Sequence, residues 1–511
     1  MAVTAPLSEG TPRRARRSGP VLACVSVCTA LVVGFVAAIN LAVPQLAASS
    51  LRPTSSDLLW MVDAYVVIFA CLVIPAGAAG DKLGRKGVLI AGLVLFACGA
   101  AVSAMAPNVA VMLIGRAVTG VGAACVLPNC VGILLHATAP GRRPHALAVW
   151  AAATGIGGVV GNVGGGAVLS AGSWRALFVA AALLAACCAV WAARSAPRSA
   201  RLARTLDLPG TLLFVAAVVA LLIGIIEGPE QGWSSAVVLA AFACGLLLSL
   251  CWVRAELRTP HPMLDPRLFR DPVLSSAALG MTLTFFGSFG LFYVNASLLQ
   301  YGRGYSVLEA GLGIIPLTVP LLVGTRYVPG LIRRLGTPAT LSAAFALTSA
   351  GLVGLSYASA MAYPVYAAGL FVIGLGIMLA APCLTGQIAS ALPVERAGIA
   401  GGLQSATREL GSALGVAVVG TILTAGFTHH LPADLSRHTP VPRTVQEALT
   451  LAPADHTAVT EAFVHGADTA LRAAALVVLL AGAVVVAGTR RGCRKPAAAE
   501  AVTPPDPAPR P

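Results

Sequence analysis

The chain has 511 residues, of which 57% are hydrophobic and only 11% are charged, and its mean hydropathy is +0.84. Soluble globular domains carry roughly 25% charged residues, so this composition excludes an ordinary soluble enzyme. The net charge of +14 does not indicate nucleic acid binding, because the basic residues stand in short segments between long apolar runs. That placement is typical of a protein that crosses a membrane many times.

Apolar runs of about 20 residues recur along the whole chain, and each is long enough to cross a hydrocarbon core of ~30 Å. We therefore predict an all-α, polytopic membrane protein with 14 transmembrane helices. The expected spans are 21–43, 57–79, 87–105, 108–131, 146–169, 175–192, 208–227, 234–253, 273–297, 307–326, 338–358, 362–385, 400–425 and 469–488.

The positions of the basic residues predict the orientation of these spans in the membrane. They cluster in the N-terminal tail 1–20, in "DKLGRKG" at 81–87, in the segment 193–206 and in the C-terminal tail 489–511. With an even number of spans all these clusters fall on one side, and the positive-inside rule places both termini in the cytoplasm. The segment 427–468 is then expected to be a long external loop.

A weak internal repeat divides the chain into two halves. "GDKLGRKG" at 80–87 and "IRRLGTP" at 332–338 are short basic turns with a Leu-Gly pair, each between the second and third helices of a six-helix set. Paired six-helix bundles are a transporter architecture with the substrate site near the membrane midplane. We expect a basic tail at 1–20, an N-terminal bundle at 21–192, an inserted helix pair with its flanking loops at 193–272, a C-terminal bundle at 273–488 and a disordered tail at 489–511.

Five short motifs occur along the chain in a characteristic order. They are "WMVDAY" at 60–65, "GAAGDKLGRK" at 77–86, "LIGRAVTGVGAA" around Arg116, "LDLPG" at 206–210 and "GYSVLEAGLGIIP" at 304–316. Taken together, they resemble the fourteen-helix drug:proton antiporters of the major facilitator superfamily, over nearly the whole of residues 21–488. The resemblance implies a secondary transporter that exports drugs or antibiotics in exchange for protons.

The first loop motif is matched at Gly77, Asp81, Gly84, Arg85 and Lys86. The resemblance implies that this cytoplasmic turn stabilises the outward-facing state through charge contacts. The alternative is a solvated turn that only sets the topology. The positive-inside rule requires cations but no Asp81, which favours the conformational role.

The stretch "GIGGVVGNVGGG" at 155–166 holds seven glycines. A phosphate-binding loop would need a strand before it and a soluble domain around it, and neither is present. The stretch resembles the antiporter motif of drug exporters, with Asn162 in place of its proline. Gly161, Gly165 and Gly166 could serve close helix packing or the movement of one helix against another, and Asn162 could hydrogen-bond across helices.

Few ionisable residues lie inside the expected spans, where a charge costs at least ~2.5–3.5 kcal/mol. Asp63 and Arg116 stand at similar depth in the second and fourth spans and are therefore expected to pair. This pair is either the proton-coupling site or a static ion pair that stabilises the bundle. In the thirteenth span Arg408 and Glu409 form a second candidate, although neighbouring helical residues cannot face one cavity equally.

The first span departs from the family pattern. In "VVGFVAAINLAVP" Asn40 and Pro44 are retained, but Phe35 stands where the resemblance predicts an aspartate. Asp63 could replace that acid, coupling could use another site, or the substrate could be neutral rather than cationic. We expect Asn40, Trp60, Asn162 and Gln300 to contribute to the substrate cavity.

The leading hypothesis is proton-coupled export of a small, partly apolar drug, antibiotic or metabolite by alternating access. An uncoupled facilitator or an importer on the same scaffold is the alternative. An enzyme is the least favoured reading, because the sequence lacks His-Glu-x-x-His, Gly-x-Ser-x-Gly and Gly-Lys-Ser/Thr motifs. We expect a plasma-membrane monomer whose partners are the substrate, protons and the lipid bilayer, without nucleic acid, metal or cofactor.

Overall fold

The computed structural model of the chain describes residues 18–138, 142–197, 207–260, 262, 264–359, 361–391, 397–438 and 441–494. Every regular element in these ranges is helical. Thirteen of the described helices are long and apolar enough to cross a membrane, and Ile156–Ala171 in the described part of α5 is a shorter apolar helix. The predicted all-α membrane fold is confirmed, and the count agrees with the predicted 14 spans.

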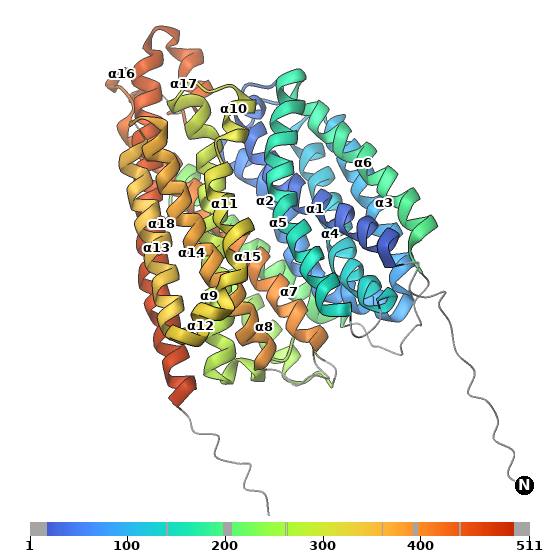
Figure 1. Cartoon of the computed structure of the whole chain (residues 1–511). Helices are drawn as coiled ribbons and strands as arrows, with labels where there is room; N and C mark the ends of the chain where they lie inside the picture. The colour runs from blue at the N-terminus through green and yellow to red at the C-terminus, as the bar shows by residue number, and fades with distance from the viewer. Residues whose placement is uncertain are drawn as a thin grey trace, which may run out of the picture.

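The first six helices form one bundle, coloured blue to green in Figure 1. The helices are α1 (Ser18–Ala47), α2 (Ser55–Leu83), α3 (Arg85–Ala104), α4 (Val109–Ala137), α5 (Arg143–Ala171) and α6 (Trp174–Ser195). α1 packs along α5, α4 and α6, while α4 also packs on α2 and α3.

The second bundle lies beside the first and is coloured yellow to red in Figure 1. Its elements are α9 (Pro272–Ser297), η4 (Leu298–Gly302), α10 (Val307–Leu312), α11 (Ile315–Gly324), η5 (Thr325–Tyr327), α12 (Val328–Leu335), α13 (Thr337–Ala358), α14 (Tyr363–Ser390), α15 (Ala397–His430), α16 (Ala433–Ser436), α17 (Val445–Leu451), η7 (Pro453–Asp455) and α18 (His456–Arg494). α9 and α18 pack along α15, and α13 packs between α14 and α18.

A helix pair joins the bundles. α7 (Leu208–Gln231) and α8 (Ala236–Glu256) pack against each other, and the short η3 (Pro266–Arg270) leads on to α9. α7 touches α2 of the first bundle and α15 of the second. α8 makes its main contact with α7, and Leu246, Leu247 and Leu250 on it are exposed.

Side-chain caps explain where several helices begin. Thr54 Oγ1 accepts a hydrogen bond from the backbone N–H of Asp57 at 3.1 Å, and the Asp57 carboxylate accepts one from the Thr54 N–H at 2.9 Å. Ser306 and Glu309 form the same capping box at α10. Asn108 caps α4, and the short segment "APN" at 106–108 therefore precedes a new helix after α3. Each cap satisfies backbone donors that a helix start leaves without a partner.

The two halves of the weak repeat fold into the same turn. Gly84, between α2 and α3, has φ 104°, and its N–H bonds to Gly80 O at 2.9 Å. Gly336, between α12 and α13, has φ 79°, and its N–H bonds to Ile332 O at 2.8 Å. Residues with a Cβ rarely adopt such φ values, so both turns require the glycine of the Leu-Gly pair.

The tenth span differs from the single helix expected at 307–326. It runs from Val307 to Leu335 as α10, α11, η5 and α12. Pro316 and Pro329 stand in the first turns of α11 and α12, and Pro320 lies inside α11. Proline removes a backbone donor, which interrupts the helix.

The segment 427–468, predicted to be one long loop, is largely helical. α15 continues to His430 and α18 begins at His456, so the link between them is much shorter than expected. Val459 and Phe463 on the first turns of α18 are buried, as is Leu435 of α16. These turns are helical because they bury one apolar face against the bundle.

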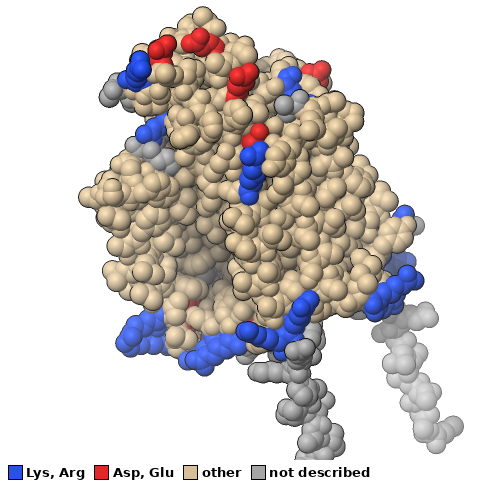
Figure 2. All heavy atoms as spheres, turned by 90° about the vertical axis from the view of Figure 1, so that its left-hand side faces the viewer, with Lys and Arg blue, Asp and Glu red and all other residues tan. Residues whose placement is uncertain are grey.

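Charge is distributed unequally between the two ends of the molecule. On the face in Figure 2, lysine and arginine side chains gather at the lower end, and aspartate and glutamate side chains gather at the upper end. We call the lower end the basic end. Arg85 begins α3 there, Arg333 and Arg334 end α12 there, and Arg490 and Arg491 lie near the end of α18.

Candidate transport site

Asp63 and Arg116 both lie in the buried interior of the first bundle, each 0% exposed. They do not form the direct ion pair that their depth predicted. The Arg116 guanidinium instead donates from Nε to Met61 O at 2.6 Å and from Nη2 to Val62 O at 3.1 Å. Both carboxylate oxygens of Asp63 are buried without a hydrogen-bond partner. The site therefore contains a cation bound to backbone carbonyls and, nearby on α2, a carboxyl group without a donor.

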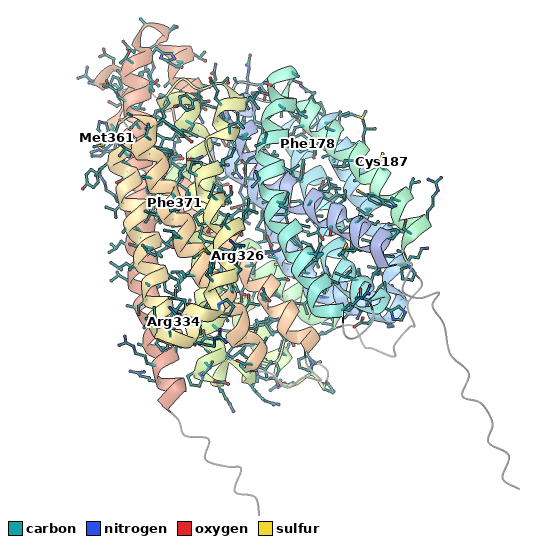
Figure 3. The ribbon with its side chains drawn as sticks, in the orientation of Figure 1. Phe178, Cys187, Arg326, Arg334, Met361 and Phe371 are labelled. Carbon is teal, nitrogen blue, oxygen red and sulfur yellow. The ribbon has the colours of Figure 1, made fainter. Side chains whose placement is uncertain are left out.

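Phe35 completes the surroundings of Arg116. The guanidinium carbon lies 5.3 Å from the centroid of the Phe35 ring and 4.8 Å from that of the Tyr65 ring. Phe35 also packs edge-on against Phe96 and Phe178, the latter labelled in Figure 3, with centroid distances of 5.4 Å and 5.6 Å. An aromatic face attracts a cation, so Phe35 stabilises the arginine without contributing a carboxylate.

Arg408 and Glu409 form an ion pair although they are neighbours on α15. Arg408 donates to Glu409 Oε1 from Nε at 2.7 Å and from Nη2 at 2.6 Å. Both side chains are long enough to meet across the helix surface, although neighbouring residues leave the helix in different directions. The guanidinium compensates the charge of Glu409 through two contacts with one carboxylate oxygen. Asp63 has no such partner.

The glycines of α5 serve two different contacts. A Cβ atom on Gly157 would lie 2.7 Å from Ala30 Cα, one on Gly161 would overlap the backbone of Gly34, and one on Gly165 would lie 2.6 Å from Ala38 Cβ. These three glycines, four residues apart, place α5 directly against α1 within the first bundle.

Gly166 faces the second bundle instead. A Cβ atom there would lie 3.1 Å from Val307 O and 3.2 Å from Leu308 Cα, both on α10. In return, Gly311 of α10 lies against the backbone carbonyl of Asn162. The two bundles thus meet through glycines on both helices, at the end of the molecule opposite the basic end.

The predicted cavity residues have different surroundings. The side-chain amide of Asn40 donates to Val36 O at 3.0 Å, and that of Asn162 donates to Gly158 O at 3.0 Å, each within its own helix. Asn162 thus donates within α5 in this state and not across to another helix. Trp60 is half-buried near the start of α2. Gln300 in η4 bridges the bundles, since its amide donates to Leu41 O at 3.2 Å.

The loop motif ties together four helices of the first bundle. Asp81 and Arg85 form an ion pair at 2.7 Å, and Lys86 donates to Ala193 O at the end of α6 at 2.8 Å. A Cβ atom on Gly132 of α4 would overlap the Arg85 guanidinium, and one on Gly77 would lie 3.4 Å from Pro128 Cβ. Asp81 therefore orients Arg85 over α4, which a purely solvated turn would not do.

Arg326 was not singled out in the sequence. It lies in η5, nine residues before the end of the tenth span at Leu335, and its guanidinium carbon is 4.8 Å from the Tyr327 ring centroid. Figure 3 shows it farther from the basic end than Arg334. The predicted span ended at residue 326, and an arginine at the end of a membrane helix is common, so this position offered no reason to select it. The sequence feature that could have identified Arg326 is its position inside a long apolar run, where arginine is rare.

Two six-helix bundles joined by a helix pair, with glycine and polar contacts where the bundles meet, define a secondary transporter. The family model described as Major Facilitator Superfamily matches residues 25–416, and the chain belongs to this superfamily.

Relatives and solved structures agree with this assignment. The chain is 30% identical to the multidrug resistance protein Stp of Mycobacterium tuberculosis, over 79% of this chain and 75% of that protein. It is 32% identical to the cephamycin export protein CmcT of Amycolatopsis lactamdurans, over 84% and 90%. A bacterial homologue of the lysosomal transporter Spinster, solved in an inward-facing and unoccupied conformation, shares the fold with a TM-score of 0.67 and 16% identity, over 95% of this chain and 98% of that chain.

Proposed function

We propose that this protein exports a small, partly apolar drug, antibiotic or metabolite across the plasma membrane in exchange for protons. Relatives whose names state export or resistance support the direction of transport. Both termini lie in the cytoplasm on this proposal, because the basic end then follows the positive-inside rule. The transporter acts as a monomer, and it moves its substrate without carrying out a chemical reaction.

Asp63 is the observation that carries proton coupling. A carboxylate buried without a hydrogen bond is unstable, so on this proposal Asp63 carries a proton in the present state. When the bundles rearrange and water or Arg116 reaches the group, the proton can leave. Glu409 is less suited to this role, because Arg408 already compensates its charge.

Alternating access requires the bundles to separate at one end while they close at the other. The contacts of Gly166 with α10 and of Gln300 with Leu41 lie at the end opposite the basic end. These contacts close the external end, so the substrate would enter from the cytoplasm in this state. The loop motif would stabilise the other state, in which the cytoplasmic ends approach each other.

The substrate need not be a cation. Phe35 removes the acid that would attract a positive charge in the first helix, and the guanidinium of Arg116 lies against its ring. We therefore propose neutral or weakly acidic compounds. Methylenomycin A, a cephamycin and tetracenomycin C, which appear in the names of relatives, form a first set of probes.

The test uses everted membrane vesicles that contain the protein, with and without an imposed pH gradient that is acidic inside. Gradient-dependent accumulation of a probe compound would support proton-coupled export. Equilibration of the probe without accumulation would support the uncoupled facilitator. Accumulation only in right-side-out vesicles would support an importer. Failure of every probe to move faster than in vesicles without the protein would contradict export of this compound class.

A further inference from the structure

A groove of about 510 Å³ lies on the surface of the second bundle, between α13 and α18. Figure 1 shows these two helices at the edge of the molecule remote from the first bundle. Neither helix takes part in the contacts described between the bundles. The groove therefore faces the membrane and is separate from the transport pathway.

Small residues create this groove. Gly482 and Ala483 on α18 and Ala346 on α13 line it, with Phe345 and Val486 beside them. A Cβ atom on Gly482 would lie 2.7 Å from the Phe345 ring, so the glycine allows α18 to pack directly against this ring at the floor of the groove. Exposed Leu479 continues its apolar rim. This surface accommodates a slender apolar chain.

Two arginines close the groove at the basic end. Arg490 and Arg491 line it and are exposed, and within the described part of the chain neither forms a hydrogen bond or an ion pair. Arg490 follows Gly482 by eight residues, which on a helix corresponds to about 12 Å. On the orientation proposed above, the cationic groups would face the cytoplasmic headgroups, while the apolar part would run toward the membrane interior.

We propose that this groove binds an anionic phospholipid, with its phosphate on Arg490 and Arg491 and one acyl chain along Phe345 and Gly482. Basic pockets between transmembrane helices on the cytoplasmic side suit anionic headgroups. The apolar groove adds a contact for the acyl chain, which a basic surface alone lacks. The site is independent of the transport cycle proposed above.

The test is native mass spectrometry of the purified full-length protein in detergent, titrated with dioleoyl phosphatidylglycerol or dioleoyl phosphatidylcholine. Phosphatidylglycerol is expected to bind more tightly. The double variant Arg490→Gln/Arg491→Gln should weaken its binding by about 30-fold, because two attractions of arginine for an anionic lipid are lost. The matched control Arg333→Gln/Arg334→Gln removes an exposed pair at the same end of the molecule, outside the groove, and should bind as the wild type does.

A second variant, Ala346→Trp, fills the groove and leaves both arginines in place. It should also weaken phosphatidylglycerol binding, and it keeps the test decisive if the arginine variant fails to fold. Equal affinity for the two lipids, or equal loss in the two double variants, would reduce the site to general surface attraction and overturn the proposal. Unchanged binding in Ala346→Trp would show that no acyl chain enters the groove, which would equally overturn it.

Discussion

On the proposed mechanism, Asp63 is the residue that couples substrate export to proton entry. Asp63→Asn removes the titratable group but breaks no hydrogen bond, because neither carboxylate oxygen has a partner in the present state. One proton that moves down 100 mV supplies ~2.3 kcal/mol, equivalent to about 50-fold accumulation of substrate. We expect the variant to lose this accumulation, measured in vesicles with an imposed gradient, while downhill exchange of substrate continues.

The control is Asp434→Asn, which removes an exposed carboxylate far from the bundle interior. It should transport as the wild type does. If Asp63→Asn still concentrates substrate and Glu409→Gln does not, the coupling group lies in α15. Disappearance of Asp63→Asn protein from the membrane would instead indicate a structural role.

Arg116 is expected to matter more for stability than for coupling. Arg116→Lys keeps the charge, but an ammonium cannot reproduce the planar contacts with Met61 O, Val62 O and the rings of Phe35 and Tyr65. Hydrogen bonds from charged groups contribute ~1.5–3 kcal/mol each. Thermal unfolding of the purified variant should begin at a clearly lower temperature than for the wild type. An unchanged unfolding temperature would show that these contacts are weak.

The sequence predicted which ionisable residues lie in the bundle interior, but it did not predict their partners. Asp63 and Arg116 stood out as embedded charges, and equal depth suggested that they pair. Depth along a helix does not fix the direction of a side chain, and the carbonyls of α2 compete for the guanidinium. Similarly, Phe35 was recognised as a missing acid, whereas its place as a ring beside Arg116 depends on five helices meeting in space.

At the scale of the element, α5 illustrates how one glycine-rich helix serves two neighbours. Gly166→Val places a branched side chain between α5 and α10, where the bundles must meet and separate. Overpacking costs ~1–3 kcal/mol, which corresponds to roughly 5- to 150-fold in an equilibrium between two states. We expect slower turnover at normal expression, measured as the initial rate of probe transport per molecule of protein.

The neighbouring glycine provides the control. A Cβ atom on Gly164 would meet no atom within 4 Å, so Gly164→Val should transport normally. Gly161→Val, whose side chain would overlap α1 within the first bundle, should lower expression and activity together. Identical behaviour of Gly166→Val and Gly161→Val would argue that Gly166 contributes only to packing.

The loop motif is the second element with a predicted conformational role. Asp81→Asn removes the partner that orients Arg85 over Gly132, so export should fall while membrane insertion is kept. The adjacent exposed cation offers a comparison, because Lys82→Gln alters the charge of the same turn but not this ion pair. Export assays at matched expression should separate the two variants. Equal transport in both would return the turn to a topological role.

The helix boundaries show which structural features hydropathy predicts and which it misses. Most spans were predicted within a few residues, because a membrane helix must be apolar over its whole length. Hydropathy missed the broken path of α10, α11 and α12, since prolines change backbone geometry without changing polarity. It also missed the first turns of α18, which are helical but lie beyond the apolar run.

At the scale of the whole molecule, we propose that the basic end faces the cytoplasm. This orientation rests on arginine and lysine gathering at one end of the structure (Figure 2) and on an even number of spans. The orientation can be measured at the polar segments between helices, because these are accessible from one side of the membrane. The residues between α15 and α18 are predicted to be external, whereas the turn after α2 is predicted to be cytoplasmic.

Cysteine labelling in intact cells tests this orientation. In a variant without the native cysteines, Ala454→Cys would lie at the exposed η7 and Gly87→Cys at the exposed start of α3. A membrane-impermeant maleimide should modify Ala454→Cys from outside and reach Gly87→Cys only after the cells are opened. The reverse pattern would place the basic end outside the cell. The contacts of Gly166 and Gln300 would then close the cytoplasmic end instead of the external end. Labelling of both positions from one side would mean that an even number of spans separates them. The whole chain would then have an odd number of spans, which would overturn the fourteen-span topology itself.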